Sequence, residues 1–433
     1  MPKVAFITLG CKVNQYETNA MSQEFIEKGY EVVEHHEKAD IYVINTCTVT
    51  NMSDRKSRQM LRRVKELNPN SIVIACGCYV QVAKDEVAKI EDIDLILGNN
   101  EKKNIVEHLE QYQKDKKRQL EIEDLMQQRE FIEFGDVTYT EKTRAVVKIQ
   151  DGCDRFCSYC IIPYARGRVR SRKPEGIISE ITKIAQEGIK EVVITGIHVA
   201  SYGKDFKENY GLIDLLEDLN KIEGIERIRL SSIEPLILDE QFINRLSKLE
   251  KICHNFHLSL QSGCDETLKR MNRRYNTEQF KTVVNLIRNT YKDAILTADV
   301  IVGFPGETEE EFEKTYKFLE DVKFYKTHIF KYSPRKGTKA AVMENQIDGN
   351  IKEQRSKKLI ELSNDFEKEY NESYIGKTVE VLWEEEKEGI YKGHTQNYLL
   401  AYYKPEKGDM NLENKITKAN CISAESDHII VEI

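Results

Sequence analysis

Residues 152–160 read GCDRFCSYC and place three cysteines, Cys153, Cys157 and Cys160, in one short segment. Three residues separate the first pair and two the second, which lets one tight loop hold three corners of an iron–sulfur cubane. No Cys or His follows nearby as a fourth ligand, whereas structural zinc sites use four, usually from paired Cys-x2-Cys arms. The spacing therefore predicts a cluster with one open iron. The alternative is a zinc loop that borrows a distant ligand.

This loop follows a candidate buried strand, which begins a long alternation of strands and helices. The expected strands are 145–150, 191–196, 227–231, 255–261, 296–303 and 327–332. The expected helices are 174–188, 212–222, 239–249, 277–291 and 309–322. Six strand–helix units predict a partial (β/α)6 barrel, a fold that carries its chemistry at the C-terminal ends of its strands.

The first hundred residues show the same alternation. Expected strands are 3–9, 41–45, 72–75 and 95–97, with helices at 19–28 and 53–67, which predicts a doubly wound parallel sheet. Cys11, Cys47 and Cys78 follow the first three strands, so they should converge in the crevice beyond the carboxyl ends. Buried unreactive thiols are the alternative, which fits any one of these cysteines but fits three equivalent positions poorly.

Cys76 competes with Cys78 for the third position of this group. It lies two residues earlier, within the strand, and we expect it to be an ordinary buried thiol. Gly77 precedes Cys78, as Gly10 precedes Cys11, and glycine suits a backbone that passes close to a cluster. Three further cysteines stand singly and are expected to be buried thiols: Cys253, Cys264 and Cys421.

A long charged helix is expected at 354–370. After it, apolar and polar residues alternate with a period of two, as in β-strands. These strands are expected at 378–383, 391–395, 398–403, 415–419 and 429–433. This pattern predicts a small all-β barrel, of a size that often binds oligonucleotides. The whole chain is therefore expected to be an α/β protein. The expected domain limits are 1–112 for the sheet, 113–138 for a linker, 139–370 for the partial barrel and 371–433 for the small barrel.

Composition restricts the class of protein. The chain has 433 residues, 40% hydrophobic and 32% charged, and no apolar run long enough to span a membrane. Residues 4–9 are too short for the apolar core of a secretory signal, so a cytoplasmic location is expected. Ten cysteines in that reducing compartment favour metal or cluster binding over disulfides. The net charge of −8 argues against a general nucleic-acid binder, although a local basic patch can still hold phosphates.

Two basic groups could form such a patch. One follows the cysteine loop and comprises Arg166, Arg168, Arg170, Arg172 and Lys173; the other comprises Lys269, Arg270, Arg273 and Arg274. A basic run is usually a solvated surface. Because the first group lies beside the expected barrel mouth, we predict that Arg166, Arg168, Arg170 and Arg172 contact RNA phosphates.

Several strand ends of the partial barrel carry residues suited to a nucleoside. They are Gly196, Ser232, Glu234, Gln261 and Gly303, with Tyr159 from the cysteine loop. Glycines expose bare backbone, and the hydroxyl and carboxylate groups suit an amino or ribose group. Each alone is more simply a turn between a strand and a helix. Together at one face they predict a cofactor pocket.

The motifs as a set resemble those of the radical SAM methylthiotransferases over essentially the whole chain. Besides the Cys153 loop, they are Cys11-Lys12-Val13-Asn14, Asn45-Thr46-Cys47, Gly77-Cys78-Tyr79, Ser231-Ser232-Ile233-Glu234-Pro235, Leu260-Gln261-Ser262-Gly263 and Gly303-Phe304-Pro305-Gly306-Glu307-Thr308. The C-terminal barrel matches the family's TRAM-like domain. Two residues depart from the family's motifs. Cys76 is an extra thiol, and Cys264 replaces the small residue expected after Gly263.

This resemblance implies two [4Fe–4S] clusters, one on Cys153, Cys157 and Cys160 and an auxiliary one on Cys11, Cys47 and Cys78. It also implies that S-adenosylmethionine binds the open barrel iron and is cleaved to a 5′-deoxyadenosyl radical. That chemistry suits an unactivated aromatic C–H bond, which offers a general base no acidity to exploit. The auxiliary cluster would carry the sulfur that a second S-adenosylmethionine methylates. No catalytic side chain is assigned beyond the clusters.

The family divides by substrate, and two segments resemble the threonylcarbamoyladenosine branch: Cys11-Lys12-Val13-Asn14-Gln15 and Gly393-His394-Thr395-Gln396-Asn397-Tyr398. The expected reaction converts N6-threonylcarbamoyladenosine next to the tRNA anticodon to its 2-methylthio derivative. Alternatives are isopentenyl-adenosine tRNA, a ribosomal-protein aspartate, or a zinc-stabilised RNA-binding scaffold without catalysis. The implied partners are tRNA, an electron donor of flavodoxin or ferredoxin type and a sulfur source, with no membrane.

Overall fold

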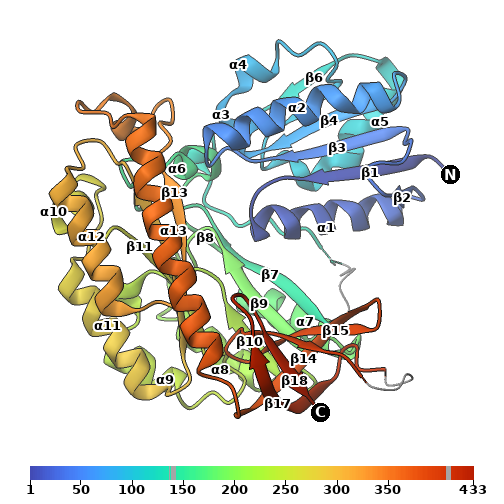
Figure 1. Ribbon diagram of the computed structural model, residues 1–433. Coiled ribbons are helices and arrows are strands. Elements are labelled where there is room, and N and C mark those ends of the chain that lie inside the picture. Colours follow the sequence, from blue (N-terminus) through green and yellow to red (C-terminus); the bar gives the residue numbers. More distant parts are fainter. Residues whose placement is uncertain (136, 138–142, 406–410) are drawn as a thin grey trace.

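The computed structural model describes residues 1–135, 137, 143–405 and 411–433 (Figure 1). It confirms the predicted α/β class and the order of three units: a parallel sheet, a partial barrel and a small closed β-barrel. The expected boundary between linker and partial barrel, at residues 138 and 139, lies outside the described residues. No helix within the described ranges is both long and apolar enough to cross a membrane.

The N-terminal sheet has six parallel strands in the order β2-β1-β3-β4-β5-β6. They are β1 (Lys3–Thr8), β2 (Glu31–Val33), β3 (Ile41–Thr46), β4 (Ile72–Gly77), β5 (Leu95–Leu97) and β6 (Gln119–Glu121). The chain runs from β1 outward to β2 and then returns to add β3 on the other side of β1. The strand order therefore reverses between β1 and β3, and this switch point is where open α/β sheets bind ligands.

Helices cover both faces of this sheet. The core on one face includes residues of α1 (Lys12–Glu27) and α5 (Ile105–Asp115). The core on the other includes residues of α2 (Asn51–Leu67), α3 (Cys78–Val82) and α4 (Lys84–Val87). Thr50 caps α2 by accepting a hydrogen bond from the backbone N–H of Ser53, which satisfies one of the free donors at a helix start. The short 3-10 turn η1 (Glu101–Asn104) precedes α5.

The sheet extends further along the chain than predicted. β2 and β6 were not expected, because each is only three residues long and largely exposed. β6 pairs in parallel with β5, and α5 runs to Asp115. The prediction of a linker from residue 113 is therefore wrong for 113–121, since these residues complete α5 and the sheet. The 3-10 turn η2 (Leu125–Gln127) follows.

The central unit contains all six predicted strands. They are β7 (Arg144–Asp151), β9 (Glu191–Gly196), β10 (Arg227–Leu230), β11 (Asn255–Gln261), β12 (Ile295–Val302) and β13 (Lys326–Lys331), with the two-residue β8 (Arg170–Ser171) antiparallel to β7. Pairing divides them into β10-β9-β7-β8 and β11-β12-β13. Single bridges, Ile228 with Ile252 and Ile233 with Leu258, join the two groups. The result is the predicted partial barrel.

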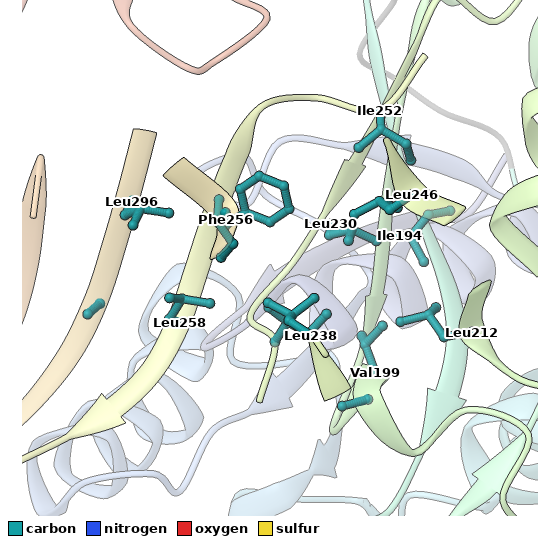
Figure 2. Packing of buried hydrophobic residues seen from close by; sticks show 14 of the residues in the cluster. Ile194, Val199, Leu212, Leu230, Leu238, Leu246, Ile252, Phe256, Leu258 and Leu296 are labelled. Carbon is teal, nitrogen blue, oxygen red and sulfur yellow. The ribbon is translucent and has the colours of Figure 1, made fainter. Parts of the chain in front are cut away.

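Helices and short turns surround these strands. They are α6 (Ile162–Arg166), α7 (Pro174–Gln186), α8 (Leu212–Asn220), α9 (Glu240–Leu246), α10 (Asp265–Arg270), α11 (Thr277–Thr290), α12 (Glu309–Val322) and α13 (Gly349–Glu372), with turns η3 (Val199–Ser201), η4 (Pro235–Ile237) and η5 (Lys339–Val342). The apolar core fills the space between strands and helices, where Leu230, Leu246 and Ile252 meet (Figure 2).

The C-terminal unit is a closed five-stranded barrel in the order β14-β15-β16-β18-β17. Its strands are β14 (Thr378–Lys387), β15 (Ile390–Thr395), β16 (Leu400–Tyr403), β17 (Ile416–Ala424) and β18 (Ile429–Glu432). Arg144, at the start of β7, pairs with Glu384 at 2.6 Å, and the Arg229 guanidinium of β10 lies 4.5 Å from the Tyr398 ring centroid. The small barrel therefore packs at the N-terminal ends of the central strands, remote from the cysteine loop (Figure 1).

Candidate active site

The loop with Cys153, Cys157 and Cys160 begins directly after β7. Gly152 adopts φ +71°, and a Cβ at this position would lie 1.8 Å from the carbonyl oxygen of Arg168, so only glycine fits. The backbone N–H of Cys153 donates to Gly167 at 3.0 Å, and that of Ser158 donates to Met271 at 3.0 Å. These bonds fix the loop at the C-terminal ends of the barrel strands, where the sequence predicted it.

Burial is the main electrostatic influence on these thiols. It raises the pKa of Cys153 to about 11. Burial, followed by the neighbouring Cys157, raises the pKa of Cys160 to about 12. Arg273 brings a cation to the group, because its Nη1 lies 3.3 Å from the Cys157 Sγ. Thiols in such surroundings keep their protons until a metal replaces them.

The N-terminal cysteines also gather, as predicted, at the switch point of their sheet. Cys11 precedes α1, Cys47 follows β3 and Cys78 begins α3. Burial raises the pKa of Cys47, and the nearby Cys78 and Cys11 raise it further. These mutual effects show that the three thiols lie close together, although they are 67 positions apart at most along the chain.

The glycines beside these cysteines are required by a close approach within the chain itself. A Cβ on Gly10 would lie 2.8 Å from the Cys47 Sγ. Gly77 has φ +99°, and a Cβ there would lie 2.5 Å from backbone atoms of Thr46. These glycines were expected to lie close to a cluster, whereas their nearest neighbours are the loops that carry the thiols.

Cys76 lies where the sequence predicted, in the interior of β4. It is fully buried in the apolar core that also contains residues of α1 and α5. Cys78, by contrast, lies 3.1 Å from the Arg166 Nε at the junction with the central unit. The two thiols therefore have different surroundings.

Single substitutions should separate these two thiols. Cys76→Ala should keep the auxiliary cluster, because it removes only an apolar-type contact, whereas Cys78→Ala should lose it. Iron content and the electron paramagnetic resonance signal of protein that also lacks Cys153, Cys157 and Cys160 would report on this cluster alone. Loss of the signal in Cys76→Ala but not in Cys78→Ala would contradict the assignment.

The separation of the thiols tests the zinc alternative. Three thiolates on one tetrahedral zinc, each about 2.3 Å from the ion, lie about 3.8 Å from one another. Among the described residues, the only three His, Cys, Asp or Glu side chains with ligand atoms within 4.8 Å of one another are Glu34, His35 and His36, which lie on an exposed loop. Neither cysteine group is this compact. Their wider spacing fits a cubane cluster better than zinc.

A buried charge network joins the two cysteine groups. Arg166, from α6 just after the Cys153 loop, donates through Nη2 to Glu17 of α1 at 3.0 Å and through Nε to Cys78. Glu17 also accepts from Lys102 at 2.6 Å and from Lys148 at 2.7 Å. Burial favours the neutral carboxylic acid, but the attraction of these three cations holds the pKa of Glu17 well below its usual value.

This network corrects the predicted phosphate contacts. Arg166, Arg170 and Arg172 have exposed fractions of 0%, 1% and 4%. Arg170 pairs with Asp151, and Arg172 with Glu180 and Glu133. The prediction that these three arginines bind RNA phosphates is wrong, because their charges are buried and already paired. Arg168 is half-buried, with its guanidinium 3.3 Å from Asp154.

The structure brings only some of the expected pocket residues together. Tyr159 and Gln261 line a cavity of about 250 Å³ that also includes Thr50, Asp299 and Phe330. This cavity lies between the two cysteine groups, because Tyr159 stands between Cys157 and Cys160 while Val49 and Thr50 follow Cys47 closely. The location suits a substrate that must meet both groups.

The other expected residues do not line this cavity, and Glu234 lines a separate cavity of about 590 Å³ together with Arg155. Glu234 pairs with Arg155 and with His198, the latter at 3.1 Å. Burial would raise the pKa of Glu234, but the hydrogen bond and charge of His198, helped by Arg155, lower it to about 2. The Ser232 Oγ lies 2.9 Å from the Ser259 Oγ.

The two glycines of the expected pocket are enclosed by other parts of the chain. A Cβ on Gly196 would lie 3.0 Å from the Gln150 carbonyl oxygen, and one on Gly303 would lie 2.2 Å from Lys352. Neither exposes bare backbone to the cavity in the way that was expected.

Several polar residues of this region were not predicted. Asp299 of β12 lines the cavity and lies 3.1 Å from the Nε2 of His257, and Arg273 contacts Cys157. The sequence did contain an indication of Asp299 and His257. Both are polar residues of barrel strands, and alternate positions of such a strand face the inside of a barrel. Arg273 belongs to a basic run that was expected either to be a solvated surface or to hold phosphates, and not to contact a thiol.

Comparisons with known proteins agree with this architecture. The chain matches the Radical SAM superfamily over residues 147–319 and the Uncharacterized protein family UPF0004 over residues 3–98. Among solved structures, the radical S-adenosylmethionine methyltransferase TsrM of Kitasatospora setae has a TM-score of 0.56 at 15% identity, covering 79% of this chain and 77% of that chain. The latter likeness concerns the fold. The central unit is thus a radical SAM domain.

Curated relatives extend over nearly the whole chain. The threonylcarbamoyladenosine tRNA methylthiotransferase MtaB of Bacillus subtilis is 42% identical over 98% of this chain and 94% of its own. Its namesake in Aquifex aeolicus is 43% identical over 92% and 95%. A tRNA-2-methylthio-N(6)-dimethylallyladenosine synthase of Clostridium botulinum is 36% identical over 98% and 96%. The chain belongs to the radical SAM methylthiotransferase family.

Proposed function

We propose that this chain converts N6-threonylcarbamoyladenosine next to the tRNA anticodon to its 2-methylthio derivative. The observation that carries the proposal is the cavity between the Cys153 loop and the Cys47 loop, because a methylthio transfer needs radical and sulfur chemistry at one substrate carbon. The identity of 42% to a relative named for this substrate, against 36% to one named for the dimethylallyl substrate, favours the threonylcarbamoyl branch.

The donor sets fit the two clusters that this chemistry requires. Cys153, Cys157 and Cys160 would hold one [4Fe–4S] cluster, and Cys11, Cys47 and Cys78 the second. With S-adenosylmethionine bound, these groups supply the radical, the sulfur and the methyl group. The half-buried Arg273 and the buried Arg166 place positive charge against one thiol of each set, which suits the negative charge of a cluster held by thiolates.

The protein's own residues would position the reactants. Glu234, held as a carboxylate, would accept hydrogen bonds from the amino or hydroxyl groups of S-adenosylmethionine, and Ser232 lies near it at the same strand end. Tyr159, Gln261 and the exposed ring of Phe330 line the space for the nucleoside. An aromatic ring at that edge suits an unstacked base.

The proposed reaction also implies partners, a location and a role for each unit of the chain. Reduction requires an electron donor, for which a flavodoxin or ferredoxin would serve, and turnover requires a sulfur source. A tRNA substrate implies a cytoplasmic reaction. We assign residues 1–121 to the auxiliary-cluster unit, 143–372 to the radical SAM unit and 377–433 to RNA binding. Arg168 remains a candidate phosphate contact.

Nucleoside mass spectrometry should test the reaction and the branch together. Cells that lack the gene should lose 2-methylthio-N6-threonylcarbamoyladenosine and accumulate its unmethylthiolated precursor. The wild-type gene should restore it, and a Cys157→Ala gene should not. If the missing nucleoside is instead the isopentenyl derivative, the branch is wrong; if all tRNA nucleosides are unchanged, tRNA is not the substrate.

A further inference from the structure

The exposed face of α2 is strongly basic. This helix carries six cations and two carboxylates, in a chain whose overall charge is −8. Arg58 and Lys65 contact Glu86 and Asp94, respectively. Four cations are exposed and have no carboxylate within 4 Å among the described residues: Arg55, Lys56, Arg62 and Arg63. Uncompensated cations on one helix face create a local positive field despite the net charge.

Most of these cations border one shallow groove. The groove has a volume of about 650 Å³ and is lined by Arg55, Arg58, Gln59, Arg62, Arg63 and Glu66. Arg55, Arg58 and Arg62 follow the helical spacing of three and four residues, so they form a row. With a rise of about 1.5 Å per residue, the row extends roughly 10 Å, enough to face two or three consecutive phosphates.

This row leads directly away from the candidate active site. Thr50 lines the catalytic cavity and also caps the first turn of α2. The backbone N–H of Asn51 donates to Ser333 at 3.0 Å, and Arg335 lies 2.6 Å from Asp54. The start of α2 is therefore fixed to the barrel loop that follows β13, and the basic face has a defined position relative to the cavity.

We propose that the groove on α2 holds the RNA phosphates that flank the modified adenosine, an inference that rests on the proposed function. The guanidinium group binds phosphate through two parallel hydrogen bonds, and the four arginines supply four such groups. A docking site for a protein would be expected to contain apolar or aromatic side chains at its centre, whereas the groove is lined only by charged and amide side chains. RNA is the better occupant.

A charge-neutralised variant tests this surface. The triple variant Arg55→Gln, Arg62→Gln and Arg63→Gln should raise the Kd for an anticodon stem-loop about tenfold, because three contacts of this kind together contribute on the order of 1.4 kcal/mol. It should also reduce the slope of log K against log salt by about two, since each lost phosphate contact removes roughly 0.7–0.9. Arg58 is kept, because it also contacts Tyr79 and Glu86.

The matched control removes the same charge from the opposite face of the sheet. Lys103, Lys114 and Lys117 are exposed on η1, on α5 and just beyond α5. Their triple replacement by Gln should leave both Kd and salt slope within error of the wild type. Both triple variants should retain wild-type iron content and melting temperature, which excludes misfolding as the cause.

The outcomes separate this inference from the proposed function. If wild-type protein binds the stem-loop and the α2 variant keeps its Kd and slope, the inference is overturned while the function stands. If the variant binds RNA normally but loses reduction by an acidic electron-transfer protein, the groove serves that protein and the inference also fails. If wild-type protein binds no tRNA, the proposed function itself fails.

Discussion

Replacing Cys153, Cys157 and Cys160 together by alanine should abolish reductive cleavage of S-adenosylmethionine and remove about half of the bound iron. Wild-type protein should hold about eight irons after anaerobic reconstitution, from two four-iron clusters. The triple variant should keep about four, because Cys11, Cys47 and Cys78 belong to a separate unit. We expect cleavage to fall to background, since the remaining group, Cys11, Cys47 and Cys78, would hold only the auxiliary cluster.

A second triple variant provides the control for this experiment. Cys253, Cys264 and Cys421 are single buried thiols outside both groups. Their replacement by alanine removes the same number of thiols and should leave iron content and cleavage near wild type. Full iron in the first variant, or a wild-type protein that contains only zinc, would refute the assignment of the clusters.

Glu17→Gln should destabilise the junction between the N-terminal and central units strongly. The substitution leaves Arg166, Lys102 and Lys148 buried with one fewer carboxylate, and removing one partner of a buried ion pair costs about 3–5 kcal/mol. Asp151, 2.6 Å from Lys148, offsets part of this cost. We expect a lower denaturation midpoint and a weakened auxiliary cluster, because Arg166 also positions Cys78.

Glu27→Gln on the same helix is the matched control, since Glu27 is exposed and accepts a hydrogen bond from another side chain of that helix, Gln23, at 2.9 Å. Surface changes of this kind usually alter stability by less than about 0.5 kcal/mol. Urea unfolding followed by fluorescence, with iron content measured in parallel, would compare the two variants. Equal midpoints for Glu17→Gln and the wild type would contradict a structural role for the network.

The strands of the central unit could be predicted because each is an apolar run with clear ends. The convergence of Cys11, Cys47 and Cys78 was also predictable, because parallel strands place their carboxyl ends at one edge. β2 and β6 could not be, since three largely exposed residues carry no periodic signal. Their existence depends on pairing with β1 and β5.

The buried arginines show where sequence reasoning fails for the site. A run with arginine at every second position looks like a basic surface, but Arg166 meets Glu17 from 149 positions away. Charge is visible in a sequence, whereas the partner that neutralises it is not. The cavity was hidden for the same reason, because Thr50, Tyr159 and Asp299 come from three distant segments.

The C-terminal barrel packs at the N-terminal ends of the central strands, whereas the cavity lies at their C-terminal ends, so the strand length sets a fixed distance between the two. The central strands β9 and β7 have six and eight residues and rise about 3.3 Å per residue, so roughly 20 Å separates the small barrel from the cavity. If the small barrel also contacts RNA, as proposed, one RNA held at both places must span this distance, which a free nucleoside cannot do. Substrate choice would then depend on the distance between a structured stem and one displaced base. The protein would recognise the shape of the RNA more than its sequence.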